Sequence, residues 1–179
     1  MPKALVSLAI AASLHSSTTS AEEPSRPPDY MPAIRQELAR LDANATCDDA
    51  SATCVFTRSA KDGRSFEIAL RYSEKTRTVY IFIERYLVLD GSSGPSLELA
   101  RRLLELNRRL VTAKFEWDRT GGTVRLSMVL NTDSNFDRRA LRSQIEGLGT
   151  AATELWPELS TLADGSDEGG KPEKKETNR

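Results

Sequence analysis

The sequence predicts one α+β domain in which helices pack on an antiparallel sheet of about five strands, in the order α-β-β-β-α-β-β-α. Three observations lead to this prediction. Residues 97–110 carry apolar side chains at three- and four-residue spacing and run directly into two alternating segments joined by a glycine turn. Three strand-like segments precede them, and a second apolar helical stripe follows. Because short turns join the neighbouring strands, we expect antiparallel pairing.

The first 21 residues have the features of a signal peptide. Lys3 precedes an apolar run from Ala4 to Leu14, which is too short to span a bilayer, and small residues continue to Ala21. We expect cleavage after Ala21 and a periplasmic or secreted mature chain; the alternative is a frayed or buried N-terminal helix. No cysteine lies between the apolar run and the predicted cleavage site, so we expect no lipid anchor in the membrane.

Composition predicts the other boundaries. Residues 22–29 are polar and rich in proline, as expected of a linker. The folded domain is predicted over residues 30–163. Residues 164–179 are charged and glycine-rich without apolar side chains, which predicts a disordered charged tail.

The N-terminal half of the domain is predicted to contain one helix and three strands. Asp29 is placed to cap a short helix over Pro32–Leu41, whose inner side would carry Ile34, Leu38 and Leu41. After a loop over 42–52, the predicted strands are Cys54–Arg58, Phe66–Tyr72 and Thr78–Leu89. The third is almost continuously apolar, which suits a central strand covered on both faces or one that extends into an interface.

Cys47 and Cys54 are the only two cysteines and are separated by six residues. In an oxidising compartment they can close a small loop, so export predicts a disulfide between them. A zinc site is the competing interpretation. It lacks ligands, because the only histidine, His15, would leave with the signal peptide.

The second half begins with the helix over Leu97–Leu110, which Gly94-Pro95 would start. Its predicted apolar stripe consists of Leu97, Ala100, Leu103, Leu104, Leu110 and Val111, with Asn107 on the same face. A hairpin of strands 111–118 and 124–130 follows. The last helix would bury Leu141, Ile145, Leu148, Ala152, Leu155 and Leu159 and would kink or end at Trp156-Pro157.

These features resemble the YbjN family, described as bacterial sensory transduction regulators, which shares its fold with the class I type III secretion chaperones. The resemblance rests on the helix Leu97–Leu110 with Asn107, the hairpin from Ala113-Lys114-Phe115-Glu116-Trp117 to Leu130, and the ending Leu155-Trp156-Pro157-Glu158-Leu159. It covers about Pro32 to Leu162. It implies a non-enzymatic protein-binding module that is often dimeric, and it supplies no catalytic residues.

The residues themselves show no catalytic chemistry. A mature chain without histidine lacks the commonest general base. Glu67, Glu84 and Glu116 lie on predicted strands, where we expect them to form a polar sheet face paired with arginines. The 25 basic and 26 acidic residues nearly balance, which argues against nucleic acid as a partner. We therefore expect no enzyme activity, no cofactor and no metal.

Two functions remain as hypotheses. The first is an exported interaction module that binds another protein or itself as a homodimer. Tyr80, Phe82, Tyr86 and Trp117 would lie in the core or, on an aromatic sheet face, form its interface. The alternative is a small-ligand sensor or carrier with a pocket between the central helix and the sheet. Asn107 would line that pocket; as a structural residue it would instead satisfy backbone groups where the helix meets the hairpin.

Overall fold

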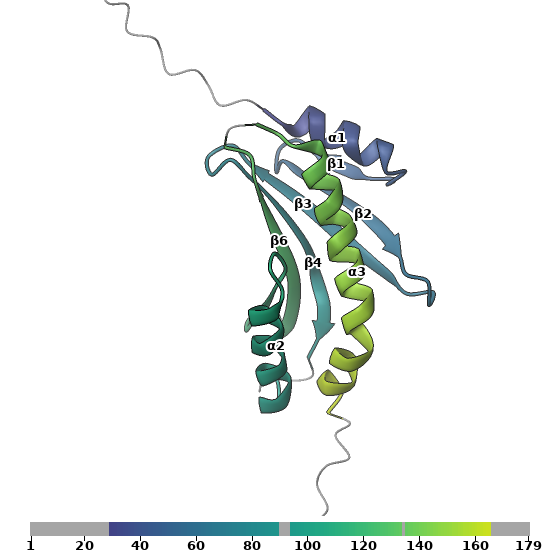
Figure 1. Cartoon of the computed structure of the whole chain (residues 1–179), viewed down its shortest axis with the longest axis vertical. Helices are drawn as coiled ribbons and strands as arrows, with labels where there is room; N and C mark the ends of the chain where they lie inside the picture. The colour runs from purple at the N-terminus through teal and green to yellow at the C-terminus, as the bar shows by residue number, and fades with distance from the viewer. Residues whose placement is uncertain (1–28, 90–93, 134, 166–179) are drawn as a thin grey trace, which may run out of the picture.

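Three helices and one six-stranded antiparallel sheet make up the described part of the chain (Figure 1). The computed structural model describes residues 29–89, 94–133 and 135–165. The helices are α1 (Met31–Arg40), α2 (Leu97–Arg109) and α3 (Arg138–Ala163). The strands are β1 (Thr46–Asp48), β2 (Thr53–Ser59), β3 (Ser65–Ser73), β4 (Thr78–Val88), β5 (Lys114–Asp118) and β6 (Thr123–Asn131). The predicted signal peptide, nearly all of the linker and residues 166–179 of the predicted tail lie outside the described residues.

The sheet has the order β1-β2-β3-β4-β6-β5, and every neighbouring pair is antiparallel. The predicted fold class is confirmed. The strand that the sequence did not predict is β1, within the segment expected to be a loop. Three residues are too few to produce a recognisable alternation, so only pairing with β2 defines this strand.

All three helices lie on the same side of the sheet (Figure 1). α3 crosses that side and contacts β4 and β6, while α1 and α2 contact α3 from either side. The core lies between this helical layer and the inner face of the sheet. As predicted, Leu141, Ile145, Leu148, Ala152 and Leu159 of α3 are fully buried. The opposite face of the sheet, which we call the open face, carries no helix from the described residues.

α3 does not end at Trp156-Pro157 but continues to Ala163. Trp156 packs edge-on against Phe66 and Tyr86, with ring centroids 5.8 and 5.4 Å away. The Tyr86 hydroxyl donates a hydrogen bond to the Ala152 carbonyl at 2.9 Å. These contacts anchor the helix before Pro157, and the fully buried Leu159 anchors it after the proline. Tertiary packing therefore outweighs the local cost of proline in the helix.

α2 turns a different side toward the core than the sequence predicted. Leu99, Leu103 and Leu106 are buried, whereas Leu97 and Leu104 are 67% and 70% exposed. Val111, predicted on the same stripe, is 93% exposed and precedes β5. The helix begins after Ser96, whose hydroxyl accepts a hydrogen bond from the Leu99 amide at 3.1 Å. The leucines form two stripes, and only the position of the sheet decides which is inner.

A buried ion pair that the sequence analysis missed fixes α1 on α3. The side chain of Glu37 is fully buried between Ile34 and Leu38, and its carboxylate accepts hydrogen bonds from Arg142 Nε, at 2.9 Å, and from Arg142 Nη2. Arg40 contacts the other carboxylate oxygen. The sequence contained a signal for this ion pair, because Glu37 lies between Ile34 and Leu38 on the predicted inner side of a short helix. A charge that is buried there needs a partner of opposite charge.

Candidate functional site

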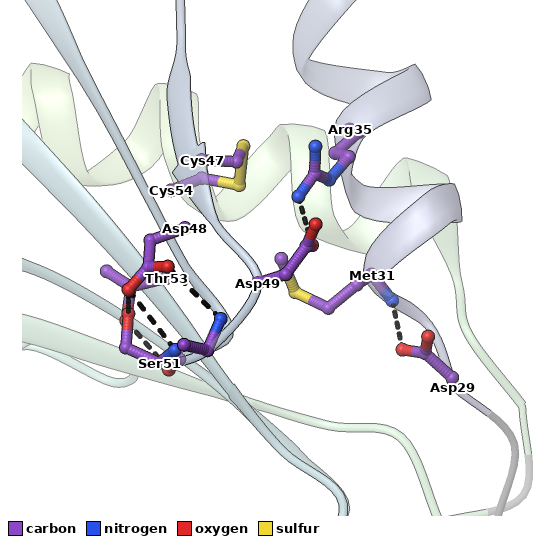
Figure 2. A network of polar contacts seen from close by, with 10 residues as sticks. Asp29, Met31, Arg35, Cys47, Asp48, Asp49, Ser51, Thr53 and Cys54 are labelled. Carbon is purple, nitrogen blue, oxygen red and sulfur yellow. Dashed lines mark hydrogen bonds and ion pairs between the residues drawn. A yellow bond between two sulfur atoms is a disulfide. The ribbon is translucent and has the colours of Figure 1, made fainter.

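The disulfide predicted from the sequence is present and ties the edge strand β1 to β2 (Figure 2). Cys47 and Cys54 face each other directly in the β1–β2 register. The turn between the strands is held by Asp48, whose carboxylate accepts hydrogen bonds from the Ala50 amide at 3.1 Å and the Ser51 hydroxyl at 2.6 Å. The Ser51 hydrogen bond lowers the pKa of the Asp48 carboxyl.

Helix α1 contacts the same turn. Arg35 forms an ion pair with Asp49, and the Asp29 carboxylate accepts a hydrogen bond from the Met31 amide at 2.9 Å at the start of α1 (Figure 2). Both cysteines are oxidised, so this region contains no free thiol. The cluster therefore holds the edge of the sheet in place and contains no nucleophile or metal ligand set.

Asn107 joins α2 to the edge strand β5. Its Nδ2 donates a hydrogen bond to the Phe115 carbonyl at 3.0 Å, and its Oδ1 accepts one from the Phe115 amide at 2.7 Å. β6 pairs with one edge of β5, and Asn107 lies at the other edge. At Phe115 the Asn107 amide therefore makes the two backbone hydrogen bonds that a neighbouring strand would make. Lys114 Nζ donates to the Asn107 and Leu110 carbonyls, which closes the end of α2. The amide is thus used for structure and is not free to bind a ligand.

An aromatic and arginine cluster lies on the open face. The rings of Tyr80 and Phe82 stack with centroids 4.8 Å apart. The Arg125 and Arg71 guanidinium carbons lie 5.0 and 5.9 Å from the Phe82 ring centroid. These side chains leave Phe82 only 5% exposed although no helix covers it. β4, which corresponds to the third predicted strand, is therefore covered on both faces. Helices cover one face, and long polar side chains cover the other.

Two of the three predicted carboxylates on this face, Glu84 and Glu116, are paired with Arg125, whereas Glu67 forms no ion pair within the described residues. Arg125 forms ion pairs with Glu84 and with Glu116, the latter at 3.5 Å. Glu116 also accepts hydrogen bonds from the Tyr80 hydroxyl at 2.6 Å and the Ser127 hydroxyl at 2.7 Å. The Glu84 hydrogen bond raises the pKa of Arg125, while burial raises the pKa of Tyr80. Neither Glu84 nor Glu116 is left free to act as a general acid or base.

The four aromatic residues predicted as an interface do not gather at one surface. Tyr86 is fully buried in the core, and Phe82 lies beneath the arginines. Tyr80 is half-buried on the open face. Trp117 is 46% exposed on β5, where its ring packs against Gly94, whose φ is +78°. A Cβ at position 94 would lie 2.6 Å from the indole, so this approach requires glycine.

The exposed apolar side chains of α2 and its C-terminal extension form a row of Leu97, Leu104 and Val111, which we call the outer stripe. Leu97 and Leu104 lie two turns apart on α2, and Val111 follows the end of the helix at Arg109. The sequence analysis assigned these residues to the core, so it found the stripe but not its orientation. Within residues 29–89, 94–133 and 135–165, no group of three or more His, Cys, Asp or Glu side chains could hold a metal ion.

Comparison with known proteins identifies the fold. No family model matches the sequence, and no curated protein is significantly similar to it. YbjN from E. coli matches the structure with a TM-score of 0.55 at 14% identity, over 77% of this chain and 94% of that chain. A chain of the HopA1–SchA chaperone–effector complex matches with a TM-score of 0.51 at 14% identity, over 74% and 99%.

The heterodimeric ExoU–SpcU complex from the type III secretion system of Pseudomonas aeruginosa also contains a similar chain. Its TM-score is 0.50 at 19% identity, and the match covers 74% of this chain and 99% of that chain. The chain therefore has the fold of YbjN and the type III secretion chaperones, as the sequence resemblance predicted. At these identities the comparison identifies a fold shared with protein-binding chaperones.

Proposed function

We propose that this chain is an exported, non-enzymatic protein-interaction module that pairs with a second copy of itself through the outer stripe of α2. The observation that carries the proposal is the double-sided character of α2. One stripe of leucines packs into the core, and a second stripe, in which Leu97 and Leu104 are 67% and 70% exposed, faces away from it. Exposed apolar rows of this kind are typical of helix–helix interfaces.

The structural neighbours support a protein-binding role. Two of them are complexes, one described as a chaperone with its effector and one as a heterodimer. The open face supports a role without catalysis, because Glu84 and Glu116 are both occupied by Arg125. The small-ligand alternative gains no support from Asn107, whose amide is bound to the Phe115 backbone.

Two features are consistent with export. The first 21 residues have the order of charge, apolar run and small residues that signal peptidases recognise. The Cys47–Cys54 disulfide is a bond that persists in oxidising compartments. Separately, none of the described helices has the length and apolar character needed to cross a membrane.

The oligomeric state tests the interface. We expect sedimentation equilibrium of the purified protein to give a concentration-dependent dimer, because three apolar side chains per copy leave water on pairing. Leu104→Lys should shift the protein to a monomer that unfolds at the melting temperature of dilute, dissociated wild type, since Leu104 is exposed within one copy. Val129→Lys is the matched control, because Val129 is also exposed but lies on the open face. A strictly monomeric wild type, or a dimer unaffected by Leu104→Lys, would refute the proposed interface.

A further inference from the structure

β3 and β4 pair along only part of their length. Their ladder runs from Ser73↔Thr78 to Ala69↔Phe82 and stops there, although β3 reaches back to Ser65 and β4 continues to Val88. Their outer edges remain paired, with β2 and β6 respectively. The sheet is therefore divided between residues 65–68 of β3 and 84–88 of β4, and Figure 1 shows the two strands diverging beside α3. We call this region the split.

Two features of the sequence open the split. Ile83 pairs with Leu126, but the next paired residue, Leu87, faces Val124, so three residues of β4 stand opposite Arg125 alone. Such a bulge bends its strand and increases its twist. In addition, continuing the β3–β4 register would place Glu67 directly opposite Glu84, and like charges in that position destabilise a sheet.

The split contains a cavity of about 410 Å³, lined by both strand arms and by α3. Phe66, Ile83 and Trp156 form its apolar part. The Arg64 guanidinium carbon lies 5.5 Å from the centroid of the Trp156 ring and is ion-paired with Asp62. The cavity thus has an aromatic floor supplied by the helix and open strand edges as its walls.

The backbone of β3 faces this cavity with groups that pair with no strand in the described part of the chain. The Tyr72 amide donates to the Ala52 carbonyl at 2.9 Å, so the even-numbered residues of β3 turn their backbone groups toward β2. By alternation, Ser65 and Glu67 turn their amides and carbonyls toward β4, where the ladder has ended. An edge of this kind is a template for another strand.

The side chains beside that edge define what could bind. Glu67 is exposed and forms no ion pair within the described residues, and Glu84 across the split shares its charge with Arg125. A strand added to β3 would place one side chain beside Glu67 on the open face and its neighbours toward Phe66 and Trp156. Charge complementarity therefore favours a basic residue in the bound strand beside Glu67. The apolar floor favours apolar residues at the neighbouring positions, which face Phe66 and Trp156.

We propose that the split binds an extended segment of a partner polypeptide in which basic and apolar residues alternate. The segment pairs its backbone with Ser65–Ile68, sets a basic side chain beside Glu67 and packs an apolar side chain against Trp156. This inference deepens the proposed function, on which it rests, by naming the chemistry of a partner. It uses a surface separate from the outer stripe of α2.

Tryptophan fluorescence provides the test. Trp117→Phe leaves Trp156 as the only tryptophan, and a capped peptide of alternating valine and lysine is the probe. We expect saturable quenching or a shift of Trp156 emission. Replacing the lysines by glutamates should weaken binding at least about threefold, the size of a surface charge effect. N-methylating alternate amides of the lysine peptide should weaken it about tenfold or more, because strand pairing loses its hydrogen bonds.

Charge reversal on the protein completes the test. Glu67→Lys should reverse the preference between the lysine and glutamate peptides. Glu146→Lys is the control and should leave the preference unchanged, because Glu146 is exposed on α3 and does not line the split. If Glu67→Lys fails to fold, Glu67→Gln should abolish the preference. The proposal is overturned if Trp156 does not respond to the lysine peptide, if N-methylation has no effect, or if Glu67 variants keep the wild-type preference. Sedimentation of the same samples reports the dimer independently, so failure here leaves the proposed function standing.

Discussion

Asn107 satisfies both backbone groups of Phe115, and this contact explains why a polar residue occupies the inner side of α2. A leucine at this position would bury more apolar surface but would leave one amide and one carbonyl without partners at the edge of β5. Unpaired backbone groups at a sheet edge favour pairing with other chains. The side chain thus stabilises the helix–hairpin junction and shields the edge strand.

We expect Asn107→Leu to lower the free energy of unfolding by about 1–3 kcal/mol, the cost of leaving hydrogen-bonding groups unsatisfied. Urea unfolding measures this change. Asn135→Leu, at an exposed position, is the matched control and should change stability by less than about 0.5 kcal/mol. Equal stability of the two variants would mean that the Asn107 contact contributes nothing.

Glu37 predicts how stability depends on pH. The Arg142 hydrogen bond, opposed by burial and reinforced by the charges of Arg142 and Arg40, holds the pKa of the Glu37 carboxyl below its ordinary value of 4.5. The folded state therefore binds this proton less readily than the unfolded state. The stabilising contribution of the Glu37 carboxylate is therefore complete above pH 4.5, and it is lost as the pH falls through and below that value.

We expect Glu37→Gln to be less stable than wild type at pH 7 and the difference to shrink as the pH falls below 4.5. Denaturant unfolding across this pH range measures the difference. Glu154→Gln, at an exposed position of α3, should follow the wild-type curve. A difference between Glu37→Gln and wild type that stays constant with pH would show that the carboxylate charge is not what Arg142 stabilises.

At the scale of elements, the ends of the sheet are protected by different means. β1 is short and covalently joined to β2 by the disulfide, and β5 is blocked at Phe115 by Asn107. Between these ends, β4 carries the bulge that separates its C-terminal half from β3. Strand pairing by a partner is therefore favoured at the split, inside the sheet, over its outer edges.

The disulfide should contribute mainly by restricting the unfolded chain. For a loop as short as Cys47–Cys54, we expect the double variant Cys47→Ala/Cys54→Ala to lose about 2–3 kcal/mol in the free energy of unfolding. Thiol titration of the exported protein should find no free thiol before reduction and two after it. Hydrogen exchange should localise the change to β1 and the adjoining turn. Free thiols in unreduced protein would contradict the structure.

At the scale of the whole molecule, one helical layer covers one face of the sheet and charged side chains cover the other. This arrangement leaves the outer stripe of α2 and the split as the surfaces suited to partners. The outer stripe is apolar, and the split combines the carboxylates of Glu67 and Glu84 with the rings of Phe66 and Trp156. These two surfaces are the ones on which the proposed interaction module depends.

The proposed export can be measured directly on the full chain. We expect a C-terminally tagged version to appear in the periplasm or medium with Glu22 as its first residue, because Ala21 ends the predicted cleavage site. Fractionation followed by N-terminal sequencing tests this. An uncleaved protein in the cytosol would contradict export and would also place the cysteines in a reducing compartment.

The sequence determined where most helices and strands lie, with β1 as the exception, because periodicity, turns and caps are local. β3, β6 and α3 lie where their apolar residues recur. The sequence also predicted the Cys47–Cys54 pairing and the fold itself. Only the tertiary structure decided which stripe of α2 is buried, that Glu37 meets Arg142, and where β3 leaves β4. These outcomes depend on contacts between residues far apart in the chain, and no local pattern encodes which surfaces will meet.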